Sequence, residues 1–174
     1  MEPIEAQSTN GSLNWRTTRQ ANALPNDPVL RDWLENKGSL TRRLRDAGKS
    51  DFSLVVLDES WEAVSDEDRR LLGSDEGRFR VRRVRLGCDA VELVYACTLM
   101  PGSTLQKHPW LSELGERPLG EALADRESVQ RTEFEYAWID SGHELADSAL
   151  RDTEIAPGGL WARRSRFLVD GSPI

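Results

Sequence analysis

The sequence predicts an α+β fold, a single domain built on a mainly antiparallel sheet. Its length of 174 residues suits one domain with a substantial hydrophobic core. Short segments in which apolar and polar residues alternate follow one another, as the strands of hairpins do. Segments with helix start and stop signals lie between some of these strands. Strands and helices that mix in this way along one chain are typical of the α+β class.

The predicted helices are recognised by the capping and stop residues at their ends. Asp27 is a cap residue that precedes Pro28 in the first turn of a helix ending at Gly38. Ser39 caps a second helix, which begins with Leu40. Further helices are expected over residues 65–72, where Ser65 and Asp68 form a variant of the capping box, and over residues 105–114 and 118–123. The polar segment 141–157 is expected to be partly helical, and residues 1–13 to form a mobile polar tail ahead of a domain that covers residues 14–174.

Alternation predicts strands over residues 52–57, 79–86, 91–100, 131–139 and 160–169. In the third of these, the apolar residues at the odd positions from 91 to 99 share one face. In the fourth, Phe134, Tyr136 and Trp138 are expected to point inward.

The end of the sequence carries a strong hairpin signal. Asp170 and Gly171 follow an apolar run, and both residues of a type I′ turn need positive φ. Only three residues follow, so either the partner strand is lost or Asp170 and Gly171 merely end a terminal strand. We therefore expect the C-terminal strand to be absent and the strand over 160–169 to have an unpaired edge, which would favour self-association.

Composition limits the function classes. The formal net charge of −7 argues against a general nucleic-acid binder and, with local arginines, suggests a small anionic ligand. No apolar run approaches the ~20 residues of a membrane span and the first residues do not resemble a signal peptide, so we expect a cytoplasmic protein. Cys88 and Cys97, which we expect to be buried, make a poor zinc set with the two histidines, His108 and His143, to which we assign no role.

The segment over residues 78–86 has the most unusual pattern, because arginines alternate with apolar residues that change face within the strand. Arg82 thereby shares a face with Val84 and Leu86. A buried guanidinium is costly unless it is paired, and its planar fork matches a carboxylate. The partner could be an internal Asp or Glu, which the pattern alone favours, or the carboxylate of a ligand. The second basic run, residues 163–166, could likewise be a solvated face, a partner for acidic neighbours, or the source of a guiding positive field.

Five blocks together resemble bacterial chorismate pyruvate-lyase, in family order and with similar spacing over residues 23–174. They are Asp32-Trp33-Leu34, Gly38 to Leu44, the arginine strand with its exit Pro101 to Leu105, Leu114 to Gly120, and Leu160 to Arg166.

The resemblance implies a monomeric cytoplasmic enzyme with an antiparallel sheet, helical flaps over an enclosed site, and no metal or organic cofactor. Its reaction converts chorismate into 4-hydroxybenzoate and pyruvate on the way to ubiquinone. By the resemblance, Arg82 binds the ring carboxylate, and the backbone groups of Leu40 and Leu119 bind ligand. The family's hydroxyl-binding glutamate falls beyond Ile174, so no catalytic residue is assigned.

A second class of function is a binding protein without catalysis. The same fold is known as the effector domain of UTRA-type transcription regulators, which would need a DNA-binding module upstream; the thirteen-residue tail is too short for one. A degenerate paralogue that retains Arg82 and binds an aromatic carboxylate without turnover is a further possibility.

Overall fold

The computed structural model describes residues 13–20, 23–48, 51–89, 91–153 and 159–174. Most of the predicted polar tail therefore lies outside the described residues. The described residues group into two compact units: those within 1–35 and 133–165, and those within 36–132 and 166–174. Helices and antiparallel strand pairs make up both units, which confirms the α+β class.

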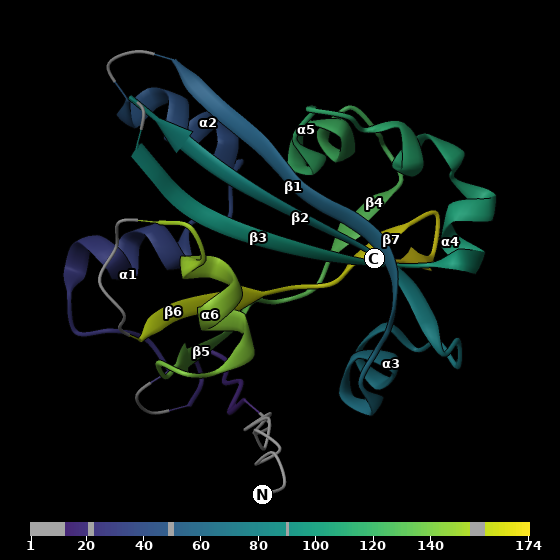
Figure 1. Cartoon of the computed structure of the whole chain (residues 1–174), viewed down its shortest axis with the longest axis horizontal. Coiled ribbons are helices and arrows are strands. Elements are labelled where there is room, and N and C mark those ends of the chain that lie inside the picture. Colours follow the sequence, from purple (N-terminus) through teal and green to yellow (C-terminus); the bar gives the residue numbers. More distant parts are fainter. Residues whose placement is uncertain (1–12, 21–22, 49–50, 90, 154–158) are drawn as a thin grey trace, which may run out of the picture. The chain divides into compact units, whose positions relative to one another are not determined.

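The larger unit contains a long antiparallel sheet of three strands in the order β1-β2-β3 (Figure 1). Its strands are β1 (Phe52–Ala63), β2 (Arg78–Cys88) and β3 (Val91–Pro101). β1 continues six residues beyond the prediction, because a register shift between Val56 and Asp58 breaks the alternation on which the prediction relied.

The described residues of this unit form five helical segments: α2 (Leu40–Ala47), α3 (Asp66–Leu72), α4 (Gly102–Lys107), the 3₁₀ segment η1 (Pro109–Glu113) and α5 (Leu119–Ala124). The predicted caps are confirmed. The side chain of Ser39 accepts a hydrogen bond from the Arg42 amide at 3.2 Å, and Ser65 accepts one from the Asp68 amide at 3.1 Å. The helix predicted over 105–114 is divided at His108.

A second, smaller sheet in the same unit has the order β4-β7-β8, with β4 (Val129–Arg131), β7 (Phe167–Val169) and β8 (Ser172–Pro173). The Asp170–Gly171 turn has φ values of 46° and 78°, as a type I′ turn requires. The chain then returns along β7, and Ile174 exchanges backbone hydrogen bonds of 2.9 and 3.0 Å with Phe167.

This hairpin corrects two expectations. The partner strand of the turn is present, although it is short, and Asp170 and Gly171 do not end a terminal strand. β7 lies between β4 and β8, so the expected free edge is wrong over residues 167–169. The prediction failed because three residues seemed too few to return, whereas backbone pairing continues through Ile174.

The hydrophobic core of this unit joins the long sheet, the helices and the small sheet. Its buried members are Met100, Leu105, Leu111, Leu123, Val169 and Ile174. Burial of Ile174 is the packing reason why the short returning strand is held in place.

The smaller unit contains α1 (Pro28–Glu35), β5 (Glu135–Ile139), α6 (Glu144–Leu150) and β6 (Leu160–Arg164), with β5 and β6 antiparallel. Asp27 caps α1 as predicted, since its Oδ1 accepts from the amides of Val29 and Leu30 at 2.8 and 2.9 Å. α6 confirms the partly helical excursion, of which residues 154–158 lie outside the described part.

The core of the smaller unit is formed by Leu34, Phe134 and Tyr136. The prediction that the side chains of Phe134 and Tyr136 point inward is thus confirmed. The same prediction is wrong for Trp138, which is 47% exposed and packs edge-on against Trp161 across the β5–β6 pair. The strand predicted over 131–139 is in fact two strands, β4 and β5, and the strand predicted over 160–169 is likewise β6 and β7. No helix among the described residues is long and apolar enough to cross a membrane.

Candidate functional site

β2 carries arginines on both faces of the long sheet, and the two faces have different environments. Arg82 alternates with Val84 and Leu86, and all three are buried. The side chain of Arg82 is only 2% exposed. The face change read from the sequence is therefore confirmed, and it places a cation inside the protein.

The guanidinium of Arg82 has two partners within the larger unit. Its Nη1 donates to Oε1 of Glu59 on β1, and its Nη2 donates to the carbonyl oxygen of Gly115 at 2.7 Å. The sequence left two possible partners for Arg82, an internal carboxylate or the carboxylate of a ligand, and the structure shows the internal carboxylate of Glu59. The bond to Gly115 also ties the loop before α5 to the middle of the sheet.

Glu59 bridges two arginines of β2. Its Oε2 accepts from Nη2 of Arg80 at 2.5 Å, while its Oε1 accepts from Arg82. Burial by itself would raise the pKa of Glu59, but hydrogen bonds and charge from Arg80 and Arg82 hold that pKa below its ordinary value. Glu59 is therefore ionised at neutral pH.

Sequence reasoning missed Glu59. It follows the predicted end of the first strand at Leu57, where an acidic residue reads as part of a polar turn. The register shift after Val56 returns Glu59 to the face of Arg82, with which it pairs across the strands. The signal that could have found it is the need of a buried arginine for a carboxylate on a neighbouring strand.

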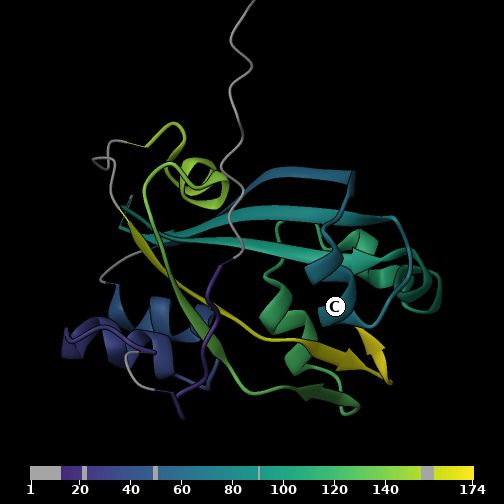
Figure 2. The ribbon, with the colours of Figure 1, turned by 90° about the horizontal axis from the view of Figure 1, so that it is seen from below.

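In the larger unit, helices α2 and α5 lie on the same side of the long sheet (Figure 2). α2 is fixed to β2 by the Cys88 thiol, which donates to the carbonyl of Leu44 at 3.2 Å. An ion pair between Arg45 and Glu121 joins α2 to α5. Because Cys88 alternates with Arg82 along β2 and Arg82 reaches the loop before α5, these helices and Arg82 share one face of the sheet.

The remaining predicted site residues begin these two helices. Leu40 is the first residue of α2 and Leu119 is the first residue of α5, and both are partly buried. The amide of a first helical residue has no partner within its own helix. The structure thus gathers α2, α5 and Arg82 in one unit, with backbone donors at the two helix starts.

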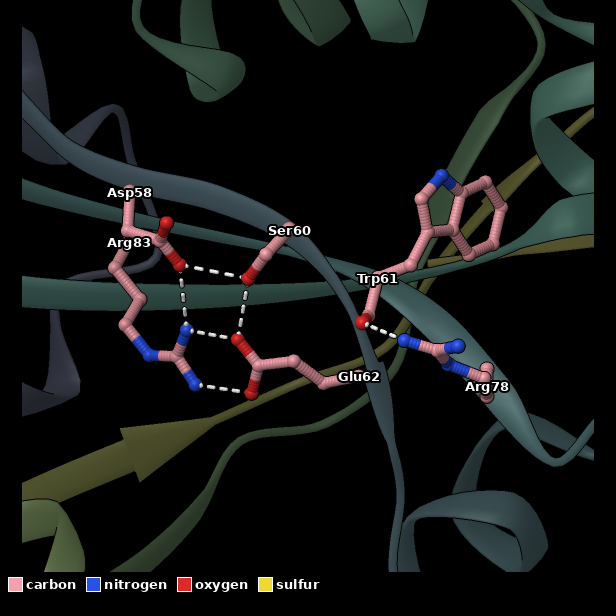
Figure 3. Close-up of polar contacts among 6 residues, drawn as sticks. All are labelled: Asp58, Ser60, Trp61, Glu62, Arg78 and Arg83. Atoms are coloured by element: carbon pink, nitrogen blue, oxygen red, sulfur yellow. Dashed lines mark hydrogen bonds and ion pairs between the residues drawn. The ribbon is translucent and has the colours of Figure 1, made fainter.

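The opposite face of β2 carries a separate ionic cluster around Arg83 (Figure 3). Arg83 donates to both carboxylate oxygens of Glu62, at 2.5 and 2.7 Å, and to Asp58 at 3.0 Å. Ser60 donates to Glu62 at 2.6 Å. Hydrogen bonds from Arg83 lower the pKa of Glu62 to about 2. Each charged side chain of this cluster has a partner of opposite sign, as in a structural ion pair.

The basic run over 163–166 also has internal partners. Arg163 donates to the carbonyl of Leu34 at 3.0 Å, and Arg164 pairs with Glu135 at 2.9 Å, both within the smaller unit. In the larger unit, Arg166 donates to the carbonyl of Leu71 at 2.9 Å. Of the open interpretations, partnership with an acidic neighbour is shown for Arg164, whereas Arg163 and Arg166 donate to backbone carbonyls.

The contacts that the structure shows for His143, His108 and Cys88 are with residues other than Arg82. His143 caps α6, since its Nδ1 accepts from the amide of Leu145 at 3.1 Å, a structural role that the sequence did not reveal. His108 Nδ1 lies 3.9 Å from an Asp170 carboxylate oxygen. Cys88 is buried as predicted, but Cys97 is exposed, so the prediction for Cys97 is wrong.

The fold and site define a class of protein: an α+β protein with a buried arginine on the helix-covered face of an antiparallel sheet. The model of one family, described as chorismate lyase, matches residues 11–174. The chain belongs to the chorismate lyase family.

Individual relatives agree with the family match. A protein of Thiobacillus denitrificans named "Probable chorismate pyruvate-lyase" is 37% identical over 148 residues, which are 84% of this chain and 79% of the relative. One of Pseudomonas fluorescens named "Probable chorismate pyruvate-lyase 2" is 35% identical over 168 residues, 92% of this chain and 84% of the relative. One of Nitrosospira multiformis, with the same name as the first, is 32% identical over 150 residues, 84% and 83% of the two chains.

Proposed function

We propose that this protein is a chorismate pyruvate-lyase, which converts chorismate into 4-hydroxybenzoate and pyruvate. The family match and the names of the relatives support this activity. The structural observation that carries it is Arg82, whose side chain is only 2% exposed and whose guanidinium donates to the loop that leads into α5. Such a group is suited to hold the ring carboxylate of a small aromatic acid or its precursor.

The reaction is an elimination that makes the ring aromatic. The C–H bond at the ring carbon bearing the hydroxyl breaks, its electron pair forms a ring double bond, and enolpyruvate leaves from the neighbouring carbon. Enolpyruvate then becomes pyruvate by taking up a proton. Because aromatisation drives the reaction, orientation of the ring and placement of charge can supply most of the acceleration.

Arg82 has donors to spare for a ligand. A guanidinium carries five N–H groups in a fixed fork, and one hydrogen bond each goes to Glu59 and to the Gly115 carbonyl. A ligand carboxylate can therefore bind while Glu59 stays in place, or replace the Gly115 carbonyl. The second route would move the loop before α5 when ligand enters.

The starts of α2 and α5 complete the proposed site. The backbone groups of Leu40 and Leu119 would bind the ligand, and their partly buried side chains would exclude water from the ring. α2 is anchored to β2 by Cys88 and to α5 by the Arg45–Glu121 pair, so the two helix starts are held relative to Arg82. No described residue is assigned to move the proton.

We place the protein in the cytoplasm as a monomer without metal or organic cofactor, and we place its product in ubiquinone biosynthesis. These assignments rest on the family resemblance.

Incubation of the protein with chorismate tests the activity. Pyruvate and 4-hydroxybenzoate should appear in equal amounts, at a rate above that of spontaneous decay and in proportion to the protein added. Tight binding of 4-hydroxybenzoate without any pyruvate release would instead assign the protein to the class of non-catalytic binders.

A further inference from the structure

Glu59, Arg80 and Arg82 form a charged cluster on one face of the long sheet, here called the Glu59 cluster. One ionised carboxylate lies between two guanidinium groups, so these three side chains together carry a net charge of one positive unit. The residues opposite the two arginines on β3 are Met100 and Thr98, which are uncharged. In a protein whose formal net charge is −7, this local excess of positive charge needs an explanation.

The cluster also contains a donor without an acceptor. Nε of Arg80 is buried and has no hydrogen-bond partner within the described residues, although Nη2 of the same side chain donates to Glu59. A buried donor left unpaired costs free energy comparable to a lost hydrogen bond. Excess positive charge and an unused donor both indicate that the cluster lacks one anionic acceptor.

The two carboxylate oxygens of Glu59 are shared between two arginines, and this sharing determines how much charge and how many donors Arg82 retains for a ligand. If Arg82 alone held both oxygens of Glu59, the pair would be neutral, and a second carboxylate would meet no net attraction. Arg80 takes one oxygen of Glu59, so each carboxylate oxygen serves one guanidinium. Arg82 therefore keeps part of its charge and donors for a ligand.

We propose that Arg80 is a positioning residue for ligand binding: it shares the charge of Glu59 and thereby leaves Arg82 able to attract a ligand carboxylate. This inference rests on the proposed function, because it takes Arg82 as the group that binds the ring carboxylate. It extends that function by naming the pair that sets the preference for a carboxylate over an uncharged group. Arg80 acts through Glu59 and needs no contact with the ring.

Calorimetric titration of the full chain tests this role with two probes, 4-hydroxybenzoate and its uncharged analogue 4-hydroxybenzamide. The variants are Arg80→Met, which removes the charge, and Arg80→Lys, which keeps it. Arg83→Met is the matched control, because Arg83 lies on the same strand, its side chain is 25% exposed against 26% for Arg80, and it faces the other side. Thermal unfolding of each variant shows that it is folded at the temperature of the titration.

Arg80→Met should weaken 4-hydroxybenzoate binding about ten- to a hundred-fold, as expected for loss of a charge-assisted interaction, and leave 4-hydroxybenzamide binding unchanged. Arg80→Lys should restore most of the affinity, and Arg83→Met should bind both probes as the wild type does. An Arg80→Met protein with wild-type affinity for 4-hydroxybenzoate, or with equal losses for both probes, would overturn the role of Arg80 while leaving the proposed function standing. A wild-type protein that binds neither probe would overturn the proposed function and this inference together.

Discussion

The Arg82 guanidinium can be buried in the interior only because its partners offset the loss of hydration. A buried cation loses its hydration, and Glu59 and the Gly115 carbonyl replace part of it. The cost of burying the cation is thus offset by groups from β1 and from the loop before α5. The same contacts hold the guanidinium in one orientation, which is what a binding site for a carboxylate needs.

Glu59→Ala should therefore destabilise the fold strongly, because it leaves a side chain that is 2% exposed without its counter-ion. We expect a loss of about 3 kcal/mol in the free energy of unfolding, measured by urea denaturation. Glu133→Ala is the control, since its ion pair with Arg19 is exposed, and it should cost less than about 1 kcal/mol. Equal effects of the two substitutions would mean that Glu59 does not support Arg82.

At the scale of the element, α2 and α3 offer a comparison between a helix at the site and one outside it. Both are short, and each is preceded by a capping serine whose side chain accepts an amide hydrogen bond. α2 contributes Leu40 to the proposed site, whereas α3 contributes no proposed ligand contact.

Ser39→Ala and Ser65→Ala should each lower the free energy of unfolding by about 1 kcal/mol through loss of the cap. Only Ser39→Ala should also weaken 4-hydroxybenzoate binding, because fraying of the first turn displaces the backbone of Leu40. Parallel titrations and thermal melts of the two variants measure both effects. If both variants bound the ligand as tightly as the wild type, the start of α2 would not be part of the site.

The elements also show what can be predicted from this sequence. Local chemistry sufficed for the caps at Asp27, Ser39 and Ser65, and the face change in β2 correctly indicated that Arg82 is buried. Features that depend on long-range pairing were not predictable in the same way. Glu59 reaches Arg82 only because of a register shift in β1, and the returning strand β8 is short enough that only burial of Ile174 and pairing with β7 reveal it.

For the whole molecule, the ion pair between Glu62 of β1 and Arg83 of β2 makes stability depend on pH. The pKa of Glu62 is lowered from its ordinary value to about 2, first by hydrogen bonds from Arg83. A lowered folded-state pKa gives stability that is present above the unfolded-state pKa and is lost as the pH falls towards 2. The side chain of Glu62 is 35% exposed, so solvent screening reduces the effect.

Glu62→Gln should accordingly be less stable than the wild type at pH 7, and the difference should shrink as the pH falls from about 4.5 to about 2. Urea denaturation of both proteins across this range measures the difference directly. A difference that stays constant from pH 7 to pH 2 would show that the charge of Glu62 contributes nothing to stability.

The central claim is that Arg82, buried on the helix-covered face of the long sheet, binds the carboxylate of the ligand. Calorimetric titration of 4-hydroxybenzoate into wild-type and Arg82→Ala protein, at a temperature where both are folded, tests it most directly. The substitution should cost about 2 to 5 kcal/mol of binding free energy, with a smaller loss for Arg80→Ala. Unchanged affinity in the Arg82→Ala protein would contradict the claim and remove Arg82 from the site.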